Sequence, residues 1–131
     1  MKTNHLWIAA IIVVLAIFAL LAAVNKEKEV EPGFYDDLAA CMTENGTKMY
    51  GAYWCPHCIS QKEKFGNSWS KVDYVECSLP NRGGQNVICD NAGITGYPTW
   101  EFGDGTRQGG DLPLDLLAEK SGCELSVSSN N

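Results

Sequence analysis

Trp54-Cys55-Pro56-His57-Cys58 is the stretch on which the interpretation of this sequence depends. It follows a Tyr-rich run, 47–54, that predicts a buried strand, and it opens a helical pattern over 56–65. A cysteine at a helix N-terminus meets free N–H groups and the helix dipole, which stabilise its thiolate. The second cysteine lies one turn further on, where it can close a disulfide onto the first. The spacing therefore predicts a redox-active pair with Cys55 as its nucleophile.

The two residues between the cysteines fit the same interpretation. Pro56 is tolerated at the start of a helix, where its missing N–H would have no partner. His57 adds a positive or hydrogen-bonding group that favours the thiolate, and a stabilised reduced form makes the disulfide more oxidising. A zinc site and an inert structural disulfide are the alternatives, but zinc normally needs a second close Cys/His pair. We therefore expect no metal and no other cofactor.

Residues 6–24 contain no charge over 19 positions, and they predict a transmembrane anchor after a short flank, 1–5. A cleaved signal sequence is the alternative. Lysines on both sides of the run leave its orientation open. The chain has six cysteines, which favours an oxidising compartment. The expected location is therefore the cell membrane, with a single span, a charged linker over 25–33 and the folded domain on the extracytoplasmic side.

The rest of the chain predicts one α/β domain over 34–123 and a disordered polar tail over 124–131. The expected elements are a helix ending at Asn45-Gly46, strands over 47–54 and 72–77, helices over 56–65 and 87–92, a hairpin over 99–108, and a last helix capped by Asp111. A strand–helix–strand unit followed by a hairpin implies a mixed central sheet with helices on both faces.

The overall charge excludes one class of function. The chain has 10 Lys and Arg against 16 Asp and Glu, a formal net charge of −6. Nucleic-acid-binding domains carry a clustered basic surface. We therefore expect no nucleic-acid partner.

The redox motif, followed 43 residues after Cys55 by Pro98 in Gly96-Tyr97-Pro98-Thr99, resembles the thioredoxin superfamily. The resemblance covers about 34–123 and implies a thioredoxin-like fold with a cis bond before Pro98, a bond type that is largely confined to proline. It also implies that Pro98 shapes a substrate groove beside the cysteines, lined by Trp54, Tyr97 and Thr99.

A narrower resemblance rests on the run from Tyr50 to Cys58, on Tyr74-Val75-Glu76-Cys77, on Cys89 and on Tyr97-Pro98-Thr99-Trp100. These residues are similar to the thioredoxin-like domain associated with bacterial vitamin K epoxide reductase homologues. In that family the domain takes electrons from reduced cysteine-containing proteins and passes them to an integral membrane quinone reductase. The resemblance therefore implies both kinds of partner for this chain.

The same family carries a second cysteine pair at the positions of Cys77 and Cys89. This pair is either a structural disulfide or an electron relay. Cys41 and Cys123 then remain, and pairing them as a second structural disulfide is an assignment by elimination, because six cysteines allow many connectivities.

The sequence departs from the thioredoxin pattern at two positions. Glu63 replaces a mid-helix proline, and Met49 stands where thioredoxins carry a buried acid that aids proton transfer from the second cysteine. The missing acid argues against efficient reductase chemistry. The expected function is therefore a membrane-anchored protein disulfide oxidase. A disulfide reductase or isomerase, and a non-catalytic binding module braced by its cysteines, remain alternatives.

Overall fold

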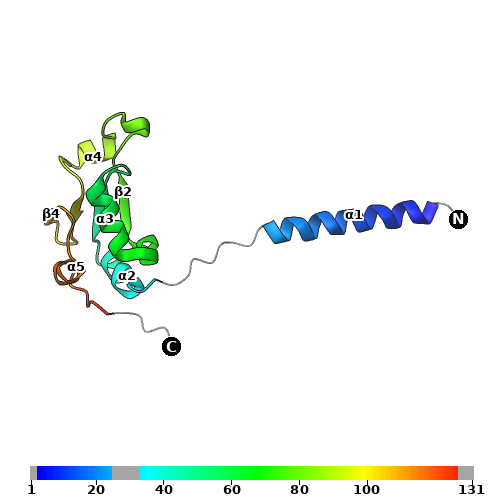
Figure 1. Cartoon of the computed structure of the whole chain (residues 1–131), viewed down its shortest axis with the longest axis horizontal. Coiled ribbons are helices and arrows are strands. Elements are labelled where there is room, and N and C mark those ends of the chain that lie inside the picture. Colours follow the sequence, from blue (N-terminus) through cyan, green and yellow to red (C-terminus); the bar gives the residue numbers. More distant parts are fainter. Residues whose placement is uncertain (1–2, 25–32, 127–131) are drawn as a thin grey trace. The chain divides into compact units, whose positions relative to one another are not determined.

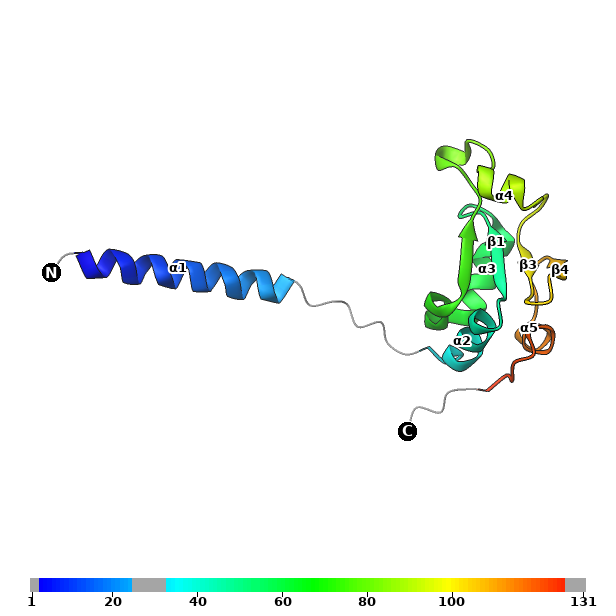
Figure 2. The ribbon, with the colours of Figure 1, turned by 180° about the vertical axis from the view of Figure 1, so that it is seen from behind.

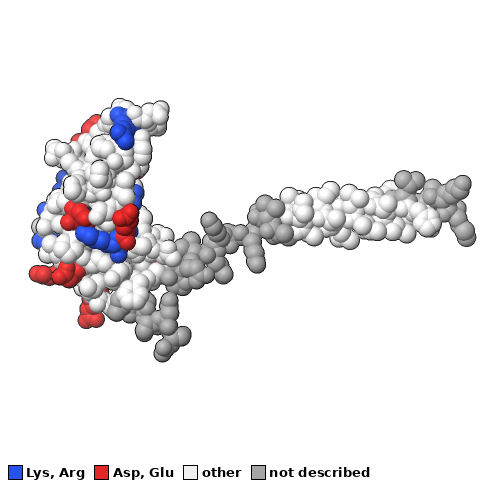
Figure 3. Space-filling view, in the orientation of Figure 1, with Lys and Arg blue, Asp and Glu red and all other residues white. Residues whose placement is uncertain are grey.

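The structure is a computed structural model that describes residues 3–24 and 33–126, in two compact units. The first unit holds one helix, α1 (Thr3–Val24), whose described part carries no Lys, Arg, Asp or Glu (Figures 1 and 3). Most of the predicted linker over 25–33 and the end of the predicted tail, 127–131, lie outside the described residues.

The predicted transmembrane anchor over 6–24 is wrong, and so is the single-pass membrane location that was based on it. Crossing a bilayer takes about 20 consecutive apolar residues. Helix α1 begins with polar residues, including the exposed Asn4 and His5. Over the described residues, no helix has both the length and the apolar character that a membrane crossing requires.

The second unit is built on a mixed sheet of four strands in the order β2-β1-β3-β4 (Figures 1 and 2). The central strand β1 (Lys48–Gly51) pairs in parallel with β2 (Asp73–Glu76) and antiparallel with β3 (Thr99–Glu101). Strand β4 (Arg107–Gly109) completes the hairpin with β3. This mixed sheet agrees with the prediction from the sequence, although β1 ends before the predicted 47–54, because the chain turns where the Cys55 N–H donates to the Ala52 carbonyl at 3.0 Å.

Helices precede, connect and follow these strands. They are α2 (Asp36–Glu44), α3 (Pro56–Phe65), α4 (Val87–Asn91) and α5 (Leu114–Ser121), with short 3-10 turns at η1 (Gly66–Lys71) and η2 (Pro80–Arg82). The predicted cap of the last helix at Asp111 is wrong, since α5 begins after Pro113. The Asp111 carboxylate instead accepts hydrogen bonds from α3.

Two hydrophobic clusters lie on opposite faces of the sheet, because successive residues of a strand point to opposite sides. Met49 belongs to the larger cluster, with buried side chains from α2, α3, β3 and α5 that include Leu38, Met42, Phe65, Trp100 and Leu117. Tyr50 belongs to the smaller cluster, with Cys77, Cys89 and Ile94. The carboxyl end of β1 therefore leads into α3 on one face, while α4 contributes Cys89 to the other.

Candidate active site

Cys55 is the N-cap residue of α3, and Pro56 follows in the first turn. The Cys55 carbonyl accepts the Ile59 N–H at 3.0 Å, so the helix begins directly at this cysteine. Its sulfur lies 3.7 Å from the Tyr97 carbonyl oxygen, to which the thiol donates, and the residue is 7% exposed. The first cysteine thus stands at a helix N-terminus, where the helix dipole favours negative charge, and it keeps a small exposed fraction.

Cys58 is a free thiol like Cys55, but it is fully buried. Burial raises the pKa of the Cys58 thiol to about 12; a backbone hydrogen bond at Ala52 lowers it, the neighbouring Cys55 raises it, and the Lys62 charge lowers it. The chain accommodates the sulfur at Gly51, where a Cβ atom would lie only 2.9 Å from it. The two thiols are therefore unequal, since Cys55 keeps a small exposed fraction and Cys58 is fully shielded and protonated at neutral pH.

The loop before β3 lies beside Cys55. Pro98 is buried and the Tyr97–Pro98 peptide bond is cis. The rings of Trp54 and Tyr97 meet edge to face, with centroids 6.2 Å apart. Thr99 stands at the start of β3, but its hydroxyl donates to the Gly96 carbonyl at 2.8 Å. Trp54 and Tyr97 are thus brought together next to the cysteine, whereas the Thr99 hydroxyl is engaged within its own loop.

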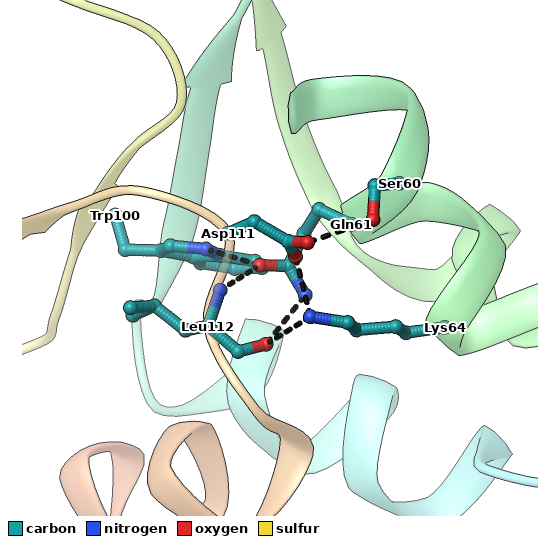
Figure 4. Close-up of polar contacts among 6 residues, drawn as sticks. All are labelled: Ser60, Gln61, Lys64, Trp100, Asp111 and Leu112. Atoms are coloured by element: carbon teal, nitrogen blue, oxygen red, sulfur yellow. Dashed lines mark hydrogen bonds and ion pairs between the residues drawn. The ribbon is translucent and has the colours of Figure 1, made fainter. Parts of the chain in front are cut away.

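Polar contacts join α3 to β3 and to the segment that follows β4 (Figure 4). The fully buried Gln61 side chain accepts the Leu112 N–H at 2.7 Å and the Trp100 indole N–H at 3.3 Å, and it donates to the Leu112 carbonyl at 3.1 Å. Because buried amides are costly without partners, these contacts hold the helix in one position against the sheet.

Asp111 adds a charged contact to the same anchor. Its carboxylate accepts from the Ser60 hydroxyl and from the Lys64 ammonium, both at 2.7 Å (Figure 4). Burial raises the pKa of Asp111, but the hydrogen bonds from Lys64 and Ser60 and the Lys64 and His57 charges hold it below its ordinary value. His57 itself is exposed in the first turn of α3.

Two disulfides join the other four cysteines. Cys41 in α2 is bonded to Cys123, which follows α5, at a sequence separation of 82 residues. Cys77, after β2, is bonded to Cys89 in α4 at a separation of 12 residues, and both are fully buried. The second bond closes the segment 78–88, which we call the braced loop.

The braced loop contacts both aromatic residues beside Cys55. The Trp54 indole N–H donates to the Ser78 hydroxyl at 2.8 Å. The Tyr97 hydroxyl donates to Gln85 Oε1, whose amide group donates in turn to the Ile94 carbonyl at 2.8 Å. The Arg82 guanidinium lies 5.6 Å from the centre of the Trp54 ring. The Cys77–Cys89 disulfide therefore supports the two sides of the site.

Sequence reasoning assigned no role to Lys62, Tyr74 or Glu76, although Lys62 and Tyr74 lie close to Cys58 and Tyr74 is hydrogen-bonded to Glu76. The Tyr74 hydroxyl donates to Glu76 Oε2 at 2.7 Å, and the Lys62 ammonium lies 3.9 Å from the centre of the Tyr74 ring. The sequence held two signals of this arrangement. Lys62 lies four residues after Cys58, on the same face of the helix, and Tyr74 and Glu76 lie two residues apart, on the same face of the strand. Among the described residues, no group of three or more His, Cys, Asp or Glu side chains is placed to hold a metal ion.

Comparison with known proteins supports a redox function. No protein-family model matches the chain. The thiol-disulfide oxidoreductase LTO1 of Arabidopsis thaliana is 42% identical over 97 residues, which cover 70% of this chain. The aligned part is 25% of LTO1, so the chain spans about a quarter of the length of this relative. The similarity supports a thioredoxin-like redox superfamily and an oxidoreductase, and it agrees with the arrangement of Cys55, Cys58 and Pro98.

Proposed function

We propose that this thioredoxin-like redox protein is a protein disulfide oxidase, which takes two electrons from a pair of cysteines in a substrate protein. The observation that carries the proposal is the unequal pair on α3. Cys55 caps the helix N-terminus and is 7% exposed, while Cys58, three residues further along the helix, is fully buried. The first sulfur is therefore the one that we expect a substrate thiolate to attack.

The proposed reaction starts from the Cys55–Cys58 disulfide. A substrate thiolate attacks the Cys55 sulfur, the bond to Cys58 breaks, and Cys58 leaves with the electron pair and takes up a proton. A second substrate thiolate then attacks the substrate sulfur of the mixed disulfide and releases the Cys55 thiolate. The substrate has lost two electrons and gained a disulfide, and the chain now holds two reduced cysteines.

The oxidase direction is favoured over reduction by the chemistry at Cys58. In reduction this thiol must be deprotonated to resolve the mixed disulfide, and burial raises its pKa to about 12. Position 49 offers no acid, because the buried residue there is Met49. Cys58 can therefore resolve a mixed disulfide only when a neighbouring side chain takes up its proton. The His57 imidazole, exposed at the same helix start, would favour the reduced form further.

A disulfide oxidase needs an oxidant to restore its disulfide. The resemblance to domains that work with vitamin K epoxide reductase homologues supports a membrane quinone reductase of that type in this role. Electrons would pass from the reduced Cys55–Cys58 pair to a disulfide of the partner, and from there to a quinone.

Trapping of mixed disulfides tests the exchange and the partners together. In the Cys58→Ser variant the mixed disulfide has no resolving thiol within the chain, so we expect adducts in the native host that a reductant cleaves. The matched Cys55→Ser variant should give none. Adducts of Cys58→Ser with cysteine-containing substrates and with a quinone reductase support the proposal. If neither variant gives any adduct, the proposal is overturned.

The reduction potential separates the oxidase from a reductase or isomerase. Equilibration with glutathione should give a potential clearly more oxidising than the value of about −270 mV typical of thioredoxin. The His57→Ala variant should be less oxidising than the unchanged chain. A thioredoxin-like potential that His57→Ala does not alter would assign the chain to the reductases.

A further inference from the structure

Cys58 faces a chemical problem that the proposed function leaves open. Each time it attacks or leaves the Cys55 sulfur, a proton must leave or reach a side chain that is fully buried. Thioredoxins have an acid below the second cysteine for this purpose, but Met49 occupies that place here. A proton acceptor must therefore come from another residue near Cys58.

The register of β1 and β2 places two polar side chains at the required position. Met49 pairs with Tyr74, and Gly51 pairs with Glu76, in the parallel ladder. Paired residues point to the same face of a sheet. A Cβ atom on Gly51 would lie 2.9 Å from the Cys58 sulfur and 2.9 Å from Cε2 of Tyr74. The sulfur and the edge of the tyrosine ring thus lie against the same point of the backbone.

Glu76 is held as a hydrogen-bond acceptor at the end of this arrangement. Its Oε2 accepts the Tyr74 hydroxyl at 2.7 Å. Its Oε1 accepts the backbone N–H of Ser78 at 2.8 Å and that of Tyr53 at 3.2 Å. Three donors therefore orient one carboxylate, and the lone pairs of the Tyr74 oxygen are left to accept a proton.

The charged and titratable groups near Cys58 come from two elements. Cys55 and Lys62 lie on α3, and Tyr74 and Glu76 lie on β2. The Lys62 ammonium is 3.9 Å from the centre of the Tyr74 ring and 5.6 Å from that of Trp69. Burial and the bond to Glu76 raise the pKa of Tyr74, so its hydroxyl keeps its proton at neutral pH. The tyrosine can then relay a proton but does not itself act as an anion.

We propose that Glu76 accepts the Cys58 proton through the Tyr74 hydroxyl, and that Lys62 favours the thiolate that results. As Cys58 attacks the mixed disulfide, its thiol proton passes to the Tyr74 oxygen and the phenolic proton passes to the Glu76 carboxylate. The Cys58–Cys55 bond forms, the bond from Cys55 to the substrate sulfur breaks, and the substrate leaves as a thiolate. The reverse path protonates Cys58 during substrate oxidation. This inference rests on the proposed function, since it concerns the resolving thiol of the same pair.

A two-phase exchange reaction tests the relay. The full chain, reduced only at Cys55 and Cys58, is mixed with the aromatic disulfide dithiobis-nitrobenzoate, which releases one coloured thiolate when Cys55 attacks it and a second when Cys58 resolves the adduct. General-base catalysis typically contributes about 100-fold or more. We expect Tyr74→Phe and Glu76→Gln to slow the second phase by about 100-fold at neutral pH and to leave the first phase unchanged.

The pH profile distinguishes a relay from a structural role. Without the relay the proton must go to hydroxide, so the second-phase rate of Tyr74→Phe should rise about tenfold per pH unit and approach the unchanged chain at alkaline pH. Lys62→Met should slow the same phase by a smaller factor. Glu76→Gln keeps an oxygen for the Tyr53 and Ser78 N–H groups, which protects the local fold.

Matched controls complete the test. Tyr50→Phe removes a hydroxyl on the opposite face of the sheet, and Lys120→Met removes a charge on α5, so neither should change the second phase. A second phase that is unaltered in Tyr74→Phe and Glu76→Gln, or one that is slowed equally in the controls, overturns the relay. Absence of the first phase in the unchanged chain would instead overturn the proposed function.

Discussion

The pair Cys55–Cys58 and the pair Cys77–Cys89 lie in the same small domain, yet only the first consists of free thiols at the start of a helix. Cys55 is 7% exposed at the start of α3, whereas Cys77 and Cys89 are both fully buried in the smaller hydrophobic cluster. Thiol–disulfide exchange needs access along the line of attack to a sulfur. Position at a helix start, more than the presence of two near cysteines, therefore distinguishes the pair that we propose to exchange from the pair that forms a disulfide.

The largest expected effect is on exchange itself. Cys55→Ser should abolish oxidation of reduced substrate proteins, because no other sulfur of the pair is accessible. The double variant Cys77→Ala/Cys89→Ala should retain exchange, measured as the rate of disulfide formation in a reduced, unfolded substrate. Loss of exchange in the double variant with its fold preserved would make the second pair an electron relay and would break the comparison.

The next effect concerns stability and uses Cys41–Cys123, which also braces the domain. Removing it as Cys41→Ala/Cys123→Ala opens a loop of 82 residues. In the chain-entropy model this lowers the free energy of unfolding by about 4.5 kcal/mol. Denaturant titration of the oxidised protein measures the change, and exchange by the folded fraction should persist.

Removal of Cys77–Cys89 should have a smaller effect on stability. Its loop spans a separation of 12 residues, so the same model gives a loss of about 3 kcal/mol. Because the braced loop contacts Trp54 and Tyr97, exchange should also slow by a few-fold. A cost equal to that of the Cys41–Cys123 variant would show that burial in the cluster, more than loop length, decides the stability.

A gradual, pH-dependent effect on stability comes from the protonation of Cys58. Its thiol pKa is raised to about 12 in the folded protein from an ordinary value of 9.0. The raised pKa therefore adds to the free energy of unfolding of the reduced protein, and this addition is complete below pH 9.0. It is lost as the pH rises toward about 12, by at most about 1.4 kcal/mol per pH unit. Chemical denaturation of the reduced chain between these pH values, compared with Cys58→Ala, measures the slope. Equal slopes in both proteins would contradict the raised pKa.

Local features of the site were predictable because they depend on neighbours in the chain. Cys55 caps α3 and Pro56 follows it, as the helix-start pattern indicated. The mixed sheet follows from the alternation of strand and helix signals. Hydropathy was less reliable, since the uncharged run over 6–24 predicted a membrane span that the described helices do not support. An apolar run reports burial from water in general and does not identify what covers it.

Helix capping and cysteine spacing act over a single turn, so the start of a helix at Cys55 and Cys58 could be predicted from the sequence alone. The distant residues that surround these cysteines depend on the tertiary structure. The edge of the Tyr74 ring and the Cys58 sulfur both lie beside Gly51, and the Ser78 hydroxyl accepts a hydrogen bond from Trp54, 24 residues earlier. Asp111, expected to cap α5, is held by α3. These contacts depend on strand register and on how helices pack against the sheet, and a one-residue shift in register would turn Tyr74 and Glu76 to the opposite face.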